Sequence, residues 1–335
     1  ETVMQKINTQ KSKGGFKFGY EIVLLLFLAA WFVFMGFANS SFVTPNNIIT
    51  VLTRISETAI VAIGMTVVII AGGFDLSVGT VMAIVPAIAG ICYGMGMNFA
   101  LALILALLVA AVIGLLNGIL IAKARFQPII GTLATMTALR SIIYVITDGR
   151  PVSTFPDGYE ELAHGTVGGF PIPIILMIVV SIVFAWIMTS TKFGRFVYAT
   201  GGNPKAANIA GVNTDQITIS VYVISALLAA FAGIIFSSRL ISASPDAGDN
   251  TAFDVVTAAL LGGTSIVGGK GNIPGTIIGV LIMNFIINGF NLLGINAYWQ
   301  MIFTGCVLLV AVGYDAKRRS GGFKVKKRNK AVAAH

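Results

Sequence analysis

The residues best placed to do chemistry are glycines around a lysine in the stretch 262–275, which reads GGTSIVGGKGNIPG. Glycine-rich loops with a lysine can cradle phosphate groups of nucleotides. The nucleotide-binding motif requires a glycine, four residues and then Gly-Lys-Ser/Thr, but Thr264 stands five residues before Gly269, and Gly271 follows Lys270. No dinucleotide-binding glycine pattern fits either. We therefore expect this chain neither to bind nor to hydrolyse ATP, and we expect no cofactor.

Groups that could perform catalysis are scarce. His164 and His335 are the only histidines, so a histidine-based triad or metal cluster cannot be assembled. Glu160 and Glu161 are adjacent, which is typical of a solvated acidic loop. The two cysteines lie in apolar runs, where free cysteine packs as a small hydrophobe. The sequence therefore predicts neither an enzyme nor a metal site.

Asp75 is the most informative single charge, because an acid beside membrane spans is costly and is usually functional. It follows Gly72 and Gly73 and precedes Ser77. A short acid at such a break can cap the following helix, expected at 78–92, and favour its dipole. Proton coupling is the other interpretation of Asp75. We favour a structural helix break and cap.

Two further sets of polar side chains fall within apolar runs. Glu57 lies three residues after Arg54, a spacing at which the two can neutralise each other on one helix face. Asn284, Asn288 and Asn291 are spaced i, i+4 and i+7, which places them on one face of a helix. This face is expected to make helix-to-helix hydrogen bonds or to line a translocation path, where amides suit sugar hydroxyls.

The basic connection 191–216 contains a patterned segment. Asn203 followed by Pro204 is a good helix start, and Gly211 is a good helix stop. The short helix between them would present Ala206 and Ala207 as small surfaces for close approach to another protein. A plain solvated loop is the alternative. We favour a docking helix, bordered on its N-terminal side by Gly201 and Gly202.

The residues discussed above lie within or next to long apolar runs. These runs are too numerous for a water-soluble protein. Of 335 residues, 56% are hydrophobic and 10% are charged, against about 25% charged in soluble domains. The fold class predicted is an all-α polytopic membrane protein. Ten membrane segments are expected, at 22–38, 48–71, 78–92, 99–122, 129–147, 172–190, 217–237, 254–268, 274–293 and 298–314. Segments 78–92 and 254–268 are shorter than the about 20 residues of a full span, so we expect short or broken helices there.

The distribution of charge predicts the orientation. Lysine and arginine concentrate at both ends and in alternate loops, whereas the opposite loops are acidic. By the positive-inside rule, both ends are cytoplasmic. We predict a basic cytoplasmic N-terminus at 1–20, a transmembrane domain at 21–316 and a basic cytoplasmic tail at 317–335. The net charge of +9 is interpreted as a topology anchor, with membrane lipid as a partner and no nucleic acid.

Four motifs occur in order: GMT at 64–66 leading to GGFDLSVG at 72–79, GGNPKAA at 201–207 ending at Gly211, LGGTS at 261–265 with glycines at 268 and 269, and NLLG at 291–294 before YWQ at 298–300. Together they resemble the permease subunits of bacterial monosaccharide ABC importers, across about residues 20–316. One departure is Ala252, which replaces a glutamate usual in that family, two residues before the retained Asp254. A role carried by that glutamate is not expected here.

The resemblance implies a multi-pass protein of the bacterial inner membrane that works by alternating access. Two permease copies would form a homodimer with an ABC ATPase subunit carrying paired nucleotide domains and with an extracytoplasmic sugar-binding protein. The cargo would be ribose or a related monosaccharide. The segment 201–211 would be the coupling helix that docks on the ATPase.

Two other classes remain open from the residues. An ion- or proton-coupled secondary carrier of a small polar solute would need Asp75 and Glu57 to titrate and would transport without ATP. A structural membrane scaffold would not transport at all.

Overall fold

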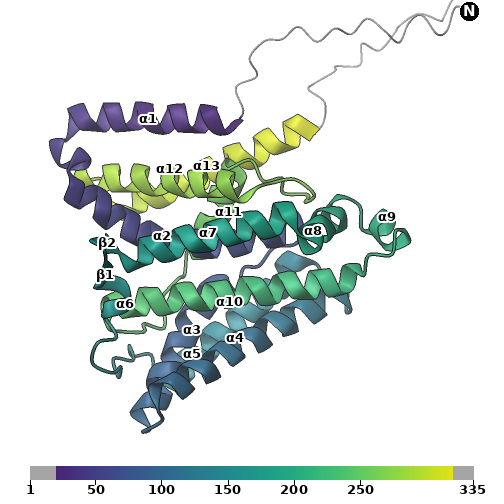
Figure 1. The fold of residues 1–335 in the computed structure, drawn as a ribbon, viewed down its shortest axis with the longest axis horizontal. Helices are drawn as coiled ribbons and strands as arrows, with labels where there is room; N and C mark the ends of the chain where they lie inside the picture. The colour runs from purple at the N-terminus through teal and green to yellow at the C-terminus, as the bar shows by residue number, and fades with distance from the viewer. Residues whose placement is uncertain (1–19, 320–335) are drawn as a thin grey trace, which may run out of the picture.

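The computed structural model describes residues 20–319, and long helices lying side by side dominate it (Figure 1). The long helices are α1 (Tyr20–Ala38), α2 (Pro45–Ile70), α4 (Phe99–Ala122), α5 (Pro128–Thr147), α7 (Ile172–Ser190), α10 (Thr214–Leu240), α12 (Ile273–Leu292) and α13 (Ala297–Arg319). The shorter elements are η2 (Ser40–Val43), α3 (Val78–Gly94), α6 (Glu161–His164), β1 (Thr166–Val167), β2 (Phe170–Pro171), α8 (Lys192–Gly202), α9 (Pro204–Ile209) and α11 (Thr251–Leu261). Nearly all of the predicted basic ends, 1–20 and 317–335, lies outside the described residues.

The all-α polytopic fold class is confirmed. Eight of the described helices are long and apolar enough to cross a membrane, and α3 and α11 are shorter apolar helices. These two lie where short or broken segments were expected, whereas a total of ten membrane segments stays a prediction. The predicted run 254–268 is wrong at its end, because α11 stops at Leu261 and Gly263 adopts a left-handed φ of 91°.

Local caps explain several helix starts. Thr44 accepts the N–H of Asn47 at the start of α2, and Asn98 accepts the N–H of Ala100 at the start of α4. Asn272 does the same for Gly275 in α12. Proline occupies one of the first two positions of α2, α5, α7, α9 and α12, where its missing N–H costs nothing. Polar residues at the ends of apolar runs therefore fix the helix boundaries.

The bundle has two distinct ends. Helices α8 and α9 project at one end, while α6, β1 and β2 lie at the other (Figure 1). Helix α1 begins and α13 ends on the side of α8 and α9. These are called the α9 end and the α6 end below.

Helix α10 lies at the centre and packs against α2, α3 and α4. Its contact with α4 depends on Gly114 and Gly118, four residues apart. A Cβ at Gly114 would lie 2.7 Å from the carbonyl oxygen of Tyr222, and one at Gly118 would lie 2.7 Å from the Cα of Ile219. Small residues at this spacing let two membrane helices approach backbone to backbone. The core is therefore held by close helix contact around α10.

Candidate coupling and translocation site

Helix α9 is a capped projection at the α9 end. The side chain of Asn203 accepts the N–H of Ala206, Pro204 opens the helix, and Gly211 follows it with a φ of 86°. The predicted start and stop are confirmed. Most of α9 is exposed, and Ile209 is 89% exposed. An apolar side chain held at the tip of a rigid projection is a suitable anchor for a partner groove.

Ala207 does not provide the docking surface that the sequence predicted. It is buried, in contact with the core next to the start of α10. Ala206 is exposed, as are Asn208, Ile209 and Ala210. Burial of Ala207 fixes the orientation of α9 against the rest of the chain. The exposed apolar surface of α9 comes from Ile209, a residue that was not predicted to contribute to docking.

Three glycine-rich stretches far apart in the sequence meet at the base of α9. We call the meeting point of Ile70, Gly72, Gly201, Gly202, Gly268 and Gly269 the glycine junction. The N–H of Gly269 donates to the carbonyl oxygen of Ile70 at 2.8 Å, and a Cβ at Gly201 would overlap that same oxygen. A Cβ at Gly269 would lie 2.7 Å from the Cα of Gly202. Gly201, Gly268 and Gly269 are therefore required for backbone contact between α2, α8 and the loop 262–272.

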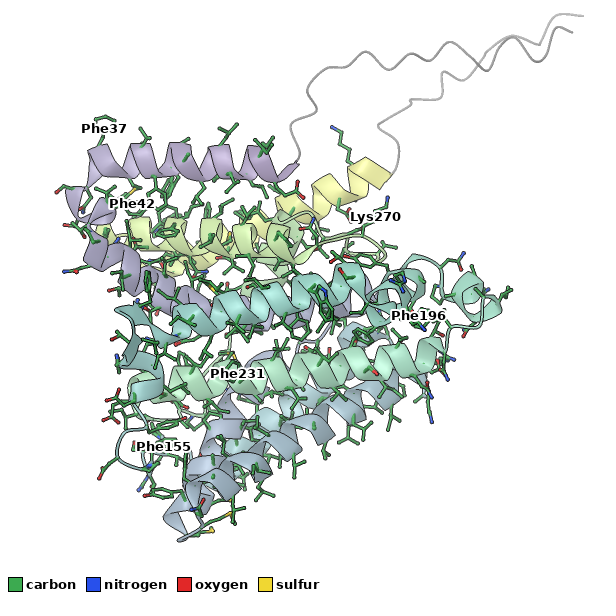
Figure 2. All side chains as sticks on the ribbon, in the orientation of Figure 1. Phe37, Phe42, Phe155, Phe196, Phe231 and Lys270 are labelled. Atoms are coloured by element: carbon green, nitrogen blue, oxygen red, sulfur yellow. The ribbon has the colours of Figure 1, made fainter. Side chains whose placement is uncertain are left out.

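Helix α8, which was not predicted from the sequence, ends at the glycine junction and is separated from α9 only by Asn203. Its Tyr198 hydroxyl donates to the carbonyl oxygen of Gly271 at 2.7 Å, and burial raises the pKa of Tyr198 above its usual value. Figure 2 places Phe196 of α8 and Lys270 of the glycine-rich loop at the α9 end. The glycine junction thus connects α8, which leads into α9, to the end of α2 and to the loop that precedes α12.

Asp75 lies in the break between α2 and α3 and is fully buried. One carboxylate oxygen accepts the N–H of Ser77 at 3.1 Å and its hydroxyl at 2.6 Å, and the other accepts the hydroxyl of Ser225 in α10 at 2.9 Å. Asn117 of α4 donates to the Ser77 hydroxyl at 2.9 Å. Ser77 is itself the N-cap residue of α3 and makes no side-chain cap bond. The carboxylate therefore joins the N-cap residue of α3 to α10, and the Ser77 hydroxyl links the break to α4. The functional role of Asp75 stays a prediction.

The three asparagines of α12 have different partners. Asn288 exchanges two hydrogen bonds of 3.0 Å with Asn47 of α2, and Asn291 accepts from Gln300 of α13 at 2.7 Å. Asn284 donates to the carbonyl of Val280 in its own helix. Two of the three thus make helix-to-helix hydrogen bonds, and a role in the translocation path stays a prediction.

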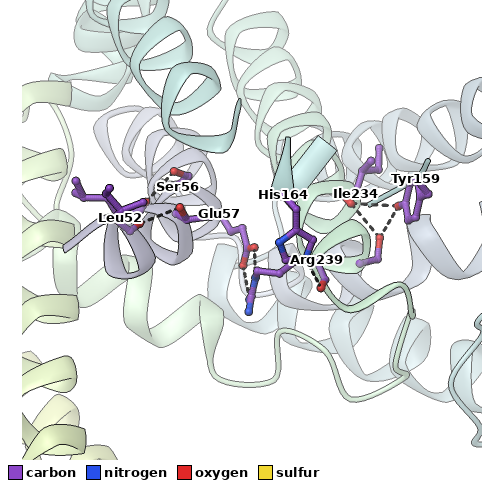
Figure 3. A network of polar contacts seen from close by, with 10 residues as sticks. Leu52, Ser56, Glu57, Tyr159, His164, Ile234 and Arg239 are labelled. Atoms are coloured by element: carbon purple, nitrogen blue, oxygen red, sulfur yellow. Dashed lines mark hydrogen bonds and ion pairs between the residues drawn. The ribbon is translucent and has the colours of Figure 1, made fainter. Parts of the chain in front are cut away.

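Glu57 does not pair with Arg54 as the sequence analysis expected. Its two carboxylate oxygens accept from Arg239 of α10 at 2.9 and 3.0 Å (Figure 3). The partners are 182 residues apart. A bidentate pair between rigid helices fixes geometry better than a pair along one helix. Glu57 is therefore neutralised as predicted, but its partner is Arg239, and the ion pair joins α2 to α10.

The loop 148–171 is attached to the same end of α10. The hydroxyl of Tyr159 lies 2.6 Å from the hydroxyl of Ser237, and the Ser238 hydroxyl donates to the carbonyl of Tyr159 (Figure 3). Burial raises the pKa of Tyr159 to about 12. The ring of His164 lies 3.2 Å from the carbonyl oxygen of Arg239. His164 therefore has a structural contact, and within residues 20–319 no three metal-ligating side chains gather.

A polar stripe on α5 was missed by the sequence analysis. Thr137, Arg140, Ser141 and Tyr144 have the spacing i, i+3, i+4 and i+7, so they share one face. All four line a cavity of about 340 Å³ together with Leu76, Gly79, Thr80, Met136, Gly248 and Asp249. The spacing alone could have revealed this face, because an arginine inside an apolar run is costly.

The geometry defines a helical membrane protein with a short, capped and mostly exposed helix projecting at one end. Residues 47–312 match the family described as branched-chain amino acid transport system / permease component. The ribose import permease protein of Haemophilus influenzae is 41% identical over 298 residues, 88% of this chain and 91% of its own. That of Bacillus subtilis is 41% identical over 288 residues, 85% and 89%.

More distant relatives carry other sugars in their names. The galactose/methyl galactoside import permease protein of Escherichia coli is 32% identical over 317 residues, 89% of this chain and 93% of its own. No solved structure matches the chain. The chain belongs to the family whose description residues 47–312 match, the permease subunits of ABC importers. It is a multi-pass inner membrane protein and not an enzyme, since the ATPase of these systems is a separate subunit.

Proposed function

We propose that this chain forms the translocation path of an ATP-driven importer of ribose or a related monosaccharide. The sugar is supported by relatives named as ribose, galactose and arabinose permeases. The partners are an ABC ATPase subunit and an extracytoplasmic sugar-binding protein. Sugar affinity would reside mainly in the binding protein, because a conduit that held sugar tightly would not release it.

Helix α9 is the observation that carries the mechanism. It is exposed, it ends on the exposed Ile209, and it stands on the glycine junction. In this proposal α9 docks on the ATPase, and closure of the paired nucleotide domains moves α8 and the backbone of α2 and α12 with it. The path then opens alternately to the two sides.

The position of α9 also bears on the orientation of the chain in the membrane and on the number of permease copies in the importer. With α9 cytoplasmic, α1 begins and α13 ends on the cytoplasmic side (Figure 1), which agrees with the positive-inside prediction for both ends. Paired nucleotide domains need two α9 helices, and each chain supplies one, so the importer holds a homodimer. Exposed apolar residues on α1, α4 and α13 would contact lipid or the second copy. The domain limits 1–20, 21–316 and 317–335, with the coupling loop at 191–216, are kept within this proposal.

Uptake in cells that lack their own pentose and hexose importers tests the function. The chain is expressed with its ATPase and its binding protein, and uptake of labelled D-ribose, D-galactose, L-arabinose and L-leucine is measured. We expect ribose uptake that disappears when any one of the three proteins is omitted. Leucine uptake without sugar uptake would contradict the proposal, and it would instead match the amino-acid description attached to the family.

A further inference from the structure

The segment 241–250 is irregular at a depth where membrane proteins rarely tolerate irregular backbone. It leaves α10 at the α6 end and contains no helix before Thr251. Its Gly248 reaches the start of α3, where a Cβ on Gly79 would overlap the Gly248 carbonyl oxygen. At 1.5 Å per residue, Gly79 is about 22 Å along α3 from Gly94. Non-helical backbone at such depth is tolerated where it is buried in protein or lines a water-filled cavity.

Arg140 fixes this segment to α5. Its guanidinium donates to the carbonyl oxygens of Pro245 and Ala247, and it pairs with Asp249 at 2.7 Å. Arg140 is seven residues, or about 10 Å, from the end of α5 at Thr147. The Arg140 side chain is 18% exposed, whereas that of Asp249 is 57% exposed. An exposed carboxylate at this depth requires a polar space beside it rather than lipid.

Thr80 adds a hydrogen-bonding group that the chain itself does not use. It lines the same cavity of about 340 Å³ and is completely buried. Its hydroxyl has no hydrogen-bond partner within residues 20–319. Buried hydroxyls are almost always paired with protein or water, so an unpaired hydroxyl in a cavity wall indicates a polar occupant.

We propose that this cavity is a transient sugar-binding subsite of the translocation path, an inference that rests on the proposed function. Thr80, Thr137 and Ser141 supply hydroxyls, and Arg140 with Asp249 supplies a donor and an acceptor pair. Such a set matches the alternating hydroxyls of a monosaccharide. The volume is at the lower end of the about 300–1,000 Å³ typical of small-molecule sites. Because Arg140 already has three protein partners, the subsite holds sugar weakly, as a conduit must.

Thr80→Val gives a clean test, because it replaces an unpaired buried hydroxyl by a methyl group of nearly equal size. The fold loses no hydrogen bond, so the Tm of the purified chain should not fall. In vesicles containing the complete importer, we expect ribose uptake to drop at least fivefold while ATP hydrolysis stays within twofold. Thr80→Ser should restore at least half of the uptake. Thr135→Val is the matched control, since its hydroxyl bonds Gly131 outside the cavity, and it should leave uptake within twofold.

Cysteine labelling provides a second measurement that does not depend on Thr80. In a Cys92→Ala, Cys306→Ala background, Ser141→Cys should react with a charged methanethiosulfonate, and ribose with its binding protein should slow the reaction at least threefold. Ile142→Cys, an exposed apolar neighbour, should show no such protection. Unchanged uptake in Thr80→Val, or no protection at 141 in vesicles that import ribose, would overturn the subsite alone. Wild-type vesicles that import none of the sugars would overturn the proposed function and the subsite with it.

Discussion

Gly201→Ala should prevent the backbone contacts of the glycine junction from forming. It should lower the free energy of unfolding by at least about 3 kcal/mol, the upper end of ordinary overpacking costs. The new methyl group would overlap the carbonyl oxygen of Ile70. That obstacle is backbone at the end of α2 and cannot rotate away. Thermal unfolding of the detergent-purified chain measures the loss, and the yield of folded protein from membranes should fall with it.

Gly202→Ala is the matched control, one residue further along α8. A Cβ at Gly202 meets nothing within 4 Å, and alanine favours a helix over glycine by about 0.5–1 kcal/mol. We expect unchanged or slightly raised stability. Equal behaviour of the two variants would contradict the backbone contact between α8 and α2.

Ile209→Glu should abolish binding of the ATPase partner without unfolding the chain. Ile209 is 89% exposed, so no contact within the chain is lost. Full burial of an isoleucine in a partner is worth about 1.5–3 kcal/mol, or about ten- to a hundredfold in affinity. Burying an unpaired carboxylate costs more. Co-purification of the tagged chain with its ATPase gives the readout, beside ribose uptake.

Three companion variants locate the effect. Ile209→Leu should retain the partner, and Ile209→Ala should weaken it by about ten- to a hundredfold. Ala207→Glu should instead destabilise the chain itself, because Ala207 is buried. Full ATPase binding by Ile209→Glu would remove α9 as the docking element.

Features set by neighbouring residues could be predicted from the sequence. The expected run 99–122 coincides with α4, and 172–190 coincides with α7, because a long apolar run ends at polar residues. Asn203 and Pro204 predicted the start of α9 in the same way. Helix α8 was missed, since it is short and not a continuous apolar run.

Features set by tertiary contact could not be predicted. The partner of Glu57 is on α10, and nothing local distinguishes Arg239 from Arg54. Gly72, Gly201 and Gly268 were recognised as parts of separate motifs, but only packing brings them together. Ala207 and Ile209 both fit a short docking helix, and burial of one face against the chain decides which of them a partner can reach. The stripe around Arg140 is different, because its helical spacing was readable.

In the proposed importer, ATP acts at the α9 end while sugar enters from the α6 end. Vesicles that hold the chain and its ATPase in one orientation, with labelled ribose and the binding protein outside, test this directly. We predict ribose accumulation only when ATP is supplied on the side that α9 faces, and none when an ion gradient replaces ATP. Accumulation driven by a proton or sodium gradient without ATP would contradict the account and identify a secondary carrier.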